Sequence, residues 1–180
     1  MYPIIRLGKT IFDAVKDTKG GTSLSITDTG RIEFTSSPTD MDNFFEMNNG
    51  RIITLFDLGR TDFAIRTGLG KRLLTKRWGL VVAGSSVQYR KRVFVFEPVS
   101  ITTKVSAFDD KWIYIEQTMW VKDTPTSSAL LRTGVTKKGR VIPTKTVFDA
   151  MGLGDIDMPP TGYVKTWIEA EAKRPWPPKE

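Results

Sequence analysis

Hydrophobic and polar residues recur with two different periods along the chain, and each change of period marks a new element. Residues 4–16 carry apolar side chains at roughly helical spacing, and Gly20-Gly21 ends that stretch. Residues 30–36 alternate polar and apolar side chains, which is typical of a strand. Residues 49–67 return to a helical period. The first third of the chain therefore predicts a short helix, a strand and a longer helix.

The helix predicted over residues 49–67 has clear ends and one apolar face. Asn48 or Asn49 is a good N-cap, because its side-chain oxygen can accept hydrogen bonds from the free N–H groups of the first turn. Gly68 and Gly70 supply the stop. The apolar face comprises Ile52, Leu55, Phe56, Gly59 and Phe63, and the other side carries Thr54, Asp57 and Thr61.

The middle of the chain is typical of strands. Four strands are predicted, over residues 78–89, 99–108, 111–122 and 127–137. We interpret the short links 94–97, 109–110 and 123–125 as hairpin turns. One strand, one long helix and four strands joined by short turns predict an α+β fold, in which an antiparallel sheet wraps around a central helix.

The tail predicts two more helices, over residues 143–151 and 163–173, with a loop at 154–160 between them. The proline-rich end 175–178 cannot continue a helix or pair in a sheet. We expect Trp176, within that end, to dock on the body of the protein.

Two absences limit the chemistry, since the 180 residues include no cysteine and no histidine. Disulfides, a thiolate nucleophile, zinc held by Cys or His, and a Ser-His-Asp triad are all excluded. Any reaction must use carboxylates, hydroxyls, backbone amides or bound water. We expect no cofactor and no metal site.

The net charge of +7 points to an anionic partner: nucleic acid, an acidic membrane surface or a phosphate-bearing small molecule. Nucleic-acid binding would need exposed aromatics interleaved with basic residues. The aromatics here follow strand or helix periodicity, so we expect core packing and no nucleic acid. Arg6 and Lys9 interrupt the first apolar stretch, and the apolar stretch 79–84 is too short to span a bilayer. We expect a soluble, cytoplasmic protein without a membrane span.

The most informative stretch runs from Asp40 to Arg60. It sets two carboxylates, Asp40 and Asp42, shortly before an Asn-Asn-Gly corner and the central helix. A carboxylate beside a helix start can act on a carbonyl compound, because the free N–H groups there can stabilise an oxyanion. Asp is also common in turns, so both carboxylates could simply cap a turn.

This stretch resembles the hotdog-fold acyl-CoA thioesterases of the 4-hydroxybenzoyl-CoA thioesterase type. That family commonly reads Asp-x-Asp-x-x-Gly-His-(Val or Met)-Asn-Asn, followed by a helix with an acid three residues before an Arg. The matching positions here are Asp40, Asp42, Met47, Asn48, Asn49, Asp57 and Arg60. Residues 87–92 and 112–117 also resemble the family's second and fourth strands. Phe45 and Glu46 depart from the pattern, because they stand where Gly-His is common.

The resemblance implies a hotdog domain over residues 29–140, with helical extensions at 1–28 and 141–180. It implies hydrolysis of acyl-CoA thioesters, and a homodimer or dimer of dimers with sites at the subunit interface. A hydratase or dehydratase on this fold would rely on a histidine, which the chain lacks. The alternative is a non-catalytic hotdog protein that binds acyl-CoA or an acyl carrier, which the replacement of His by Glu46 favours.

The resemblance places three catalytic residues. Asp42 would carry the family's acid, either as a general base toward water or as a nucleophile that forms a mixed anhydride. The backbone N–H of Asn49 would polarise the thioester carbonyl, helped by the helix dipole. Asp57 would face the partner subunit's site, or instead form a surface ion pair with Arg60. For Asp40 we favour capping.

Five further residues are candidates for substrate binding. Glu46 would take the place of the family's His, or serve as a solvated charge near the helix start, and Asn48 would shape the corner. The cluster Arg90, Lys91 and Arg92 fits the phosphates of coenzyme A, as does the cluster Lys137, Lys138 and Arg140. Both clusters also fit a solvated sheet edge, where basic residues discourage pairing between sheets.

Overall fold

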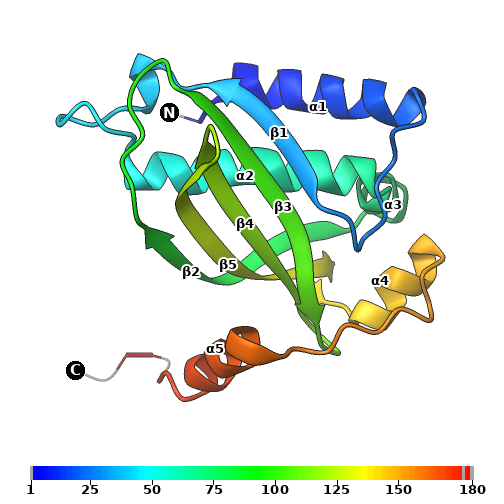
Figure 1. Ribbon diagram of the computed structural model, residues 1–180. Helices are drawn as coiled ribbons and strands as arrows, with labels where there is room; N and C mark the ends of the chain where they lie inside the picture. The colour runs from blue at the N-terminus through cyan, green and yellow to red at the C-terminus, as the bar shows by residue number, and fades with distance from the viewer. Residues whose placement is uncertain (1, 176, 179–180) are drawn as a thin grey trace.

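A curled antiparallel sheet encloses one long helix, as Figure 1 shows for this computed structural model, which describes residues 2–175 and 177–178. The elements are α1 (Ile4–Lys19), β1 (Gly30–Thr35), η1 (Pro38–Asp40), α2 (Asn49–Arg66), α3 (Leu69–Lys76), β2 (Gly79–Tyr89), β3 (Pro98–Phe108), β4 (Ile113–Val121), β5 (Thr124–Lys137), β6 (Arg140–Val141), α4 (Thr144–Met151) and α5 (Gly162–Ala172). The predicted α+β fold, with a sheet wrapped around a central helix, is confirmed.

The sheet has the order β1-β3-β4-β5-β2, and the short strand β6 pairs with β5. Every pairing is antiparallel. Strands β3, β4 and β5 form a meander, in which Phe108 pairs with Ile113 and Val121 pairs with Thr124. The hairpin turns predicted near residues 109–110 and 123–125 are therefore confirmed.

The third predicted hairpin turn, at residues 94–97, is wrong. β2 pairs with β5, whereas β3 pairs with β1 and β4, so the link between β2 and β3 is a crossover at one end of the sheet. This link is fastened to the end of β1: the Phe96 N–H donates to the Ser36 carbonyl at 3.1 Å, and the Ser36 N–H donates to the Glu97 carbonyl at 3.0 Å. The link runs from residue 90 to residue 97, longer than the predicted turn, and the strand pairing is decided by contacts with β1 and β5.

The apolar face predicted for α2 packs into the concave side of the sheet. Ile52, Leu55, Phe56 and Phe63 are all buried. The helix lies so close to the side chains of the sheet at Gly59 that a Cβ there would lie 2.7 Å from the Thr103 Oγ1 atom. Asn48 is the N-cap, and the helix ends at Arg66, so its predicted bounds hold to within one residue. The central helix is thereby fixed in position and rotation.

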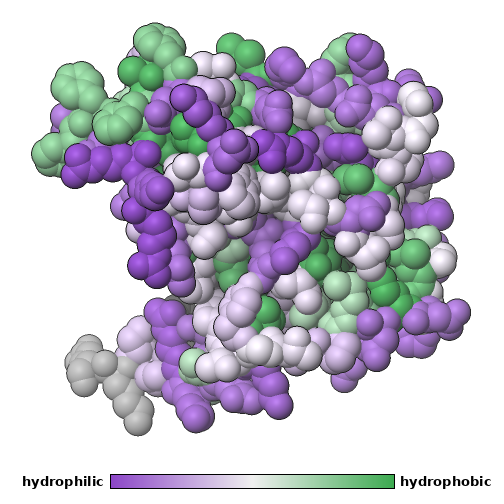
Figure 2. All heavy atoms as spheres, in the orientation of Figure 1, coloured by the Kyte–Doolittle hydropathy of each residue, from purple (hydrophilic) through white to green (hydrophobic). Residues whose placement is uncertain are grey.

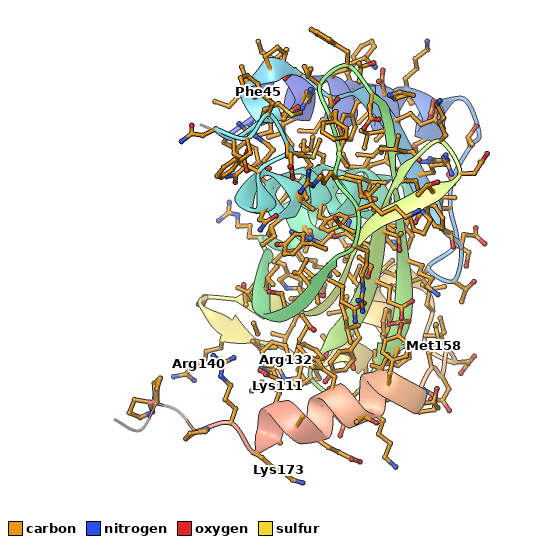
Figure 3. The ribbon with its side chains drawn as sticks, turned by 60° about the vertical axis from the view of Figure 1, so that its left-hand side comes forward. Phe45, Lys111, Arg132, Arg140, Met158 and Lys173 are labelled. Carbon is orange, nitrogen blue, oxygen red and sulfur yellow. The ribbon has the colours of Figure 1, made fainter. Side chains whose placement is uncertain are left out.

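The two C-terminal helices are confirmed, and α5 covers part of the convex face of the sheet (Figure 1). The guanidinium of Arg132 lies 5.6 Å from the ring centre of Trp112 and 5.8 Å from that of Trp167. Figure 3 shows Arg132 and Lys111 beside α5. The guanidinium thus joins β5 to α5 by cation–π contacts. Trp176, expected to dock on the body, lies outside the described residues.

In the described part of the chain, no helix combines the length and the apolar character needed to cross a membrane.

Candidate functional site

The start of α2 offers one free backbone donor. The Oδ1 atom of Asn48 accepts hydrogen bonds from the N–H groups of Gly50 at 2.9 Å and Arg51 at 3.2 Å. The N–H of Asn49, the first helical residue, has no protein acceptor within the described chain. The positive end of the α2 dipole lies at the same place. Asn48 therefore shapes the corner as expected, and the N–H of Asn49 remains available to a ligand.

Asp42 lies in the loop that leads into α2, within a tight turn closed by an isolated bridge between Met41 and Met47. Its N–H donates to the Glu46 carbonyl at 2.8 Å. Its Oδ1 atom accepts from the N–H groups of Phe44 at 2.8 Å and Glu46 at 3.4 Å. The Oδ2 atom accepts no hydrogen bond from the residues that the structure describes. The Oδ1 atom of Asp42 thus caps the turn, and the Oδ2 atom has no hydrogen-bond donor among the described residues.

Asp40 has a structural role, in agreement with the expected capping. Its side chain is 1% exposed. The Oδ2 atom accepts from Arg6 Nη1 at 2.7 Å and from the Ser37 N–H at 2.9 Å, while Arg51 Nε lies 3.3 Å from Oδ1. The Asp40 carbonyl accepts from the Asn48 N–H at 2.9 Å. Asp40 therefore holds α1, η1 and the start of α2 together.

Glu46 and Arg92, both candidates for substrate binding, contact each other. Arg92 Nε lies 3.1 Å from Glu46 Oε1. The Met47 N–H also donates to the Val93 carbonyl at 2.8 Å, so the loop before α2 and the β2–β3 link form one unit. Arg90 and Lys91 are exposed on this link. The structure thus brings the cluster Arg90–Arg92 to the loop that carries Asp42.

The second basic cluster lies elsewhere. Lys137 and Arg140 pair across the β5–β6 turn. Figure 3 places Arg140 far from Phe45, which marks the tip of the loop before α2. Within one chain, the cluster of Lys137, Lys138 and Arg140 is therefore not part of the site around Asp42.

Asp57 takes part in a polar network on α2. It forms an ion pair with Arg60, whose Nη1 atom also donates to the Oε1 atom of buried Gln117 at 2.5 Å. Gln117 Nε2 donates in turn to the Phe56 carbonyl at 2.8 Å. The predicted ion pair is present, and the Asp57 side chain remains 44% exposed. Burial and, secondly, the Asp57 carboxylate raise the pKa of the Tyr2 phenol, while Arg60 opposes the shift.

Two hollows flank this helix. An open groove of ≈ 450 Å³ beside the start of α2 is lined by Tyr2, Thr39, Asp40, Met41, Asn48, Gly50, Arg51 and Thr54. An apolar cavity of ≈ 270 Å³ lies between α2, β2 and α4, and its lining includes Asp57, Leu80, Val81, Val82 and Phe148. Tyr2 lines both hollows and Asp42 lines neither. Sequence reasoning missed Tyr2 and Leu80–Val82, although the apolar run at 79–84 was a usable signal for the latter.

Among the residues that the structure describes, no three carboxylates are grouped so that they could hold a metal ion. The chain contains no histidine or cysteine that could supply other ligands.

The chain is similar in sequence to known proteins. The model of a family described as "Thioesterase-like superfamily" matches residues 36–150. Protein THEM6 of Drosophila melanogaster is 41% identical over 93 residues, which cover 51% of this chain and 48% of that protein. Protein THEM6 of Xenopus laevis is 33% identical over 95 residues, which cover 52% and 46%. The chain thus spans about half the length of the curated relatives it matches.

Solved structures share the fold at low sequence identity. The DHNA-CoA thioesterase from Staphylococcus aureus has a TM-score of 0.60 at 17% identity, over 81% of this chain and 95% of that one. A thioesterase from Thermus thermophilus, solved with coenzyme A and Zn, has a TM-score of 0.60 at 15% identity, over 68% and 96%. Such likeness shows the fold, and it confirms the expected hotdog arrangement.

Proposed function

Because this chain belongs to the thioesterase-like superfamily, whose model matches residues 36–150, we propose that it hydrolyses acyl-CoA thioesters. The observation that carries the proposal is that two polar groups remain free, one at the first residue of α2 and one in the loop that leads into it. The Asn49 N–H is a donor without a protein acceptor in the described chain, and the Asp42 Oδ2 atom accepts no hydrogen bond from the described residues. Thioester hydrolysis needs both a donor for the oxyanion and a carboxylate.

In the proposed reaction, water adds to the thioester carbonyl, the C–S bond breaks, and a carboxylic acid and the free thiol are released. Asp42 either takes the proton of the attacking water or attacks the carbonyl itself to form an anhydride, which water then opens. The Asn49 N–H and the α2 dipole stabilise the oxyanion that forms in either route. Glu46, bound to Arg92, holds the loop that carries Asp42.

Two parts of this chain's surface match the two ends of an acyl-CoA molecule. The apolar cavity between α2 and β2 suits an acyl chain, since its lining includes Val81, Val82 and Ala64. The exposed side chains of Arg90 and Lys91 suit phosphate groups. A thioesterase of this fold from Thermus thermophilus was solved with coenzyme A, which supports this class of ligand.

We further propose a homodimer that pairs β2 with its copy. β2 ends the sheet and pairs only with β5 among the described strands, and its side chains Leu80, Val81 and Val82 are exposed. A long exposed edge of this kind favours pairing with a second chain. Asp57, beside β2 in the lining of the cavity, would then lie near the subunit interface.

The test is thiol release from short, medium, long and aromatic acyl-CoAs, comparing the wild type with Asp42→Asn. We expect the variant to lose on the order of 100- to 10,000-fold in kcat, because a general base contributes that much. The matched control is Asp28→Asn, since Asp28 also caps a turn: its Oδ2 atom accepts from the Ser25 N–H at 2.7 Å. The control is expected to keep full activity.

Two results would contradict parts of this proposal. If Asp42→Asn still hydrolyses acyl-CoA, the proposed thioesterase activity stands, but Asp42 is not its catalytic acid. Saturable acyl-CoA binding without thiol release in the wild type would favour the alternative, a hotdog protein that binds acyl-CoA or an acyl carrier without turnover. One observation supports that alternative: Glu46 replaces the family's His and forms an ion pair with Arg92.

A further inference from the structure

Helix α1 turns its apolar face away from the body of the protein. It packs through Leu7 and the buried Ala14, and it is fastened by the ion pair between Arg6 and Asp40. Its large apolar side chains are nevertheless exposed: Ile5 by 90%, Ile4 by 70% and Phe12 by 68%, with Ile11 and Val15 beside them. Figure 2 shows green side chains along the upper edge of the molecule, above α1. We call these five residues the α1 outer face.

The basic and acidic residues of α1 lie on different sides of the helix. At about 100° per residue, Lys9 and Lys16 fall beside Ile5 on one flank of the outer face, and Lys19 falls within the face, between Val15 and Phe12. Asp13 and Asp17 fall on the inner side, in a groove that they share with Lys9, with arginine side chains and with β1. Lys9 pairs with Asp13, whereas Lys16 and Lys19 form no ion pair with a carboxylate among the described residues. The outward part of α1 is therefore apolar and cationic.

We propose that α1 lies in the surface of an anionic lipid bilayer, with its outer face in the acyl boundary. A helix with an apolar face and a lysine-rich flank is typical of helices that bind in the plane of a membrane. Its 16 residues are too few to cross the hydrocarbon core, which needs about 20 apolar residues. Lysines beside the face add attraction to anionic head groups, in agreement with the net charge of +7.

A second copy of the chain is the competing occupant, and the charges disfavour it. If two α1 helices met antiparallel across a two-fold axis, each outer face would cover the other. In that arrangement the partner's outer face would offer no carboxylate to Lys16 and Lys19, because the two aspartates of α1, Asp13 and Asp17, lie on its inner side. A bilayer with anionic lipids complements both the apolar face and the lysines.

The experiment is flotation of the full chain with vesicles of phosphatidylcholine, with and without phosphatidylserine. We expect binding that requires phosphatidylserine and weakens with salt. The double variant Ile5→Ser/Phe12→Ser should lose at least tenfold in partitioning, since both side chains are exposed and their loss leaves the core intact. Lys16→Gln and Lys19→Gln should each weaken binding about fivefold, from about 1 kcal/mol per surface lysine.

The matched control is Tyr163→Ser, which removes an exposed aromatic side chain from α5, at the opposite end of the molecule (Figure 1). It should bind vesicles like the wild type, and circular dichroism should show that every variant is folded. The chain has five tryptophans, so Phe12→Trp is compared with the wild type: on addition of the anionic vesicles, only the variant's emission should gain a shift to the blue.

Three outcomes would overturn the proposal. The first is a wild type that does not float with phosphatidylserine vesicles even at low salt. The second is a double variant Ile5→Ser/Phe12→Ser that floats as well as the wild type. The third is a wild-type dimer that the double variant dissociates without vesicle binding, which would assign the outer face to a second copy of the chain.

Discussion

Arg6 of α1 reaches Asp40 of η1, where its Nη1 atom lies 2.7 Å from the buried Oδ2 atom. This contact joins an N-terminal helix to the turn that precedes the candidate site. The same carboxylate also lies 3.3 Å from Arg51 Nε on α2. The position of the site therefore depends on an interaction between segments that are far apart in the sequence.

Loss of the Asp40 carboxylate should be strongly destabilising. Asp40→Ala leaves Arg6 and Arg51 without this buried partner, and breaking a buried ion pair costs about 3–5 kcal/mol. Urea unfolding would measure the change in free energy of unfolding. The control is Glu33→Ala, which breaks an exposed pair with Arg31 and should cost less than about 1 kcal/mol. Similar losses in the two variants would contradict the structural role of Asp40.

Two glycine-to-alanine changes should have opposite effects. Inside a helix, alanine is more stable than glycine by about 0.5–1 kcal/mol. Both Gly8 and Gly59 lie inside helices. A Cβ at Gly8 meets nothing within 4 Å, whereas one at Gly59 would lie 2.7 Å from Thr103 Oγ1 and 2.9 Å from Gln117 Nε2. Gly8→Ala should raise the melting temperature. Gly59→Ala should lower it, because overpacking costs about 1–3 kcal/mol. A stabilised Gly59→Ala would show that the helix and sheet can move apart.

The N-cap of α2 should contribute to stability. Asn48→Ala leaves the N–H groups of Gly50 and Arg51 without their side-chain acceptor, which should cost about 0.5–2 kcal/mol. Asn48→Asp should restore most of this loss, since its carboxylate can accept the same two hydrogen bonds near the positive end of the helix. Thermal unfolding of the three proteins at one pH measures both effects. A variant Asn48→Asp as unstable as Asn48→Ala would contradict the cap.

Stability should depend on the ionisation of Asp62. Burial raises the pKa of its carboxyl from 3.8 to about 6, with smaller contributions from Asp17 and Asp13, while Arg66 opposes the shift. A raised pKa means that the folded state holds the proton more tightly than the unfolded state. The resulting stabilisation is complete below about pH 4 and is lost as the pH rises through about 6.

Asp62→Asn removes this titration and tests it. The melting temperature of the variant relative to the wild type should rise between about pH 4 and 7, because only the wild type must bury a carboxylate at the higher pH. Asp28→Asn, at an exposed turn, serves as the control. A difference that falls as the pH rises would contradict the raised pKa of Asp62.

The sequence was sufficient to predict the bounds of elements that are determined by residues close together in the chain. The 49–67 helix was predicted to within one residue, because its apolar period and Asn48 cap are both local features. The partners of Asp40 could not be predicted, since Arg6 comes from another helix. The pairing of β2 could not be predicted either, because the turn residues at 94–97 suggest a hairpin, whereas the link in the structure runs from residue 90 to residue 97 and crosses to another part of the sheet. Strand pairing depends on register and burial across the whole sheet.

The place of β2 in the sheet also affects how the chain folds. Gly79 pairs with Thr136, so β2 can pair only after the much later strand β5 has been made. Strands β3, β4 and β5 are consecutive in the sequence and can pair without such a delay. During synthesis, residues 78–89 emerge before their partner strand and contain no charged side chain. Such a segment is prone to aggregate while it is unpaired. Arg77 on one side and the Arg90–Arg92 cluster on the other place charges at both ends of this strand, where such residues reduce the aggregation of an apolar segment.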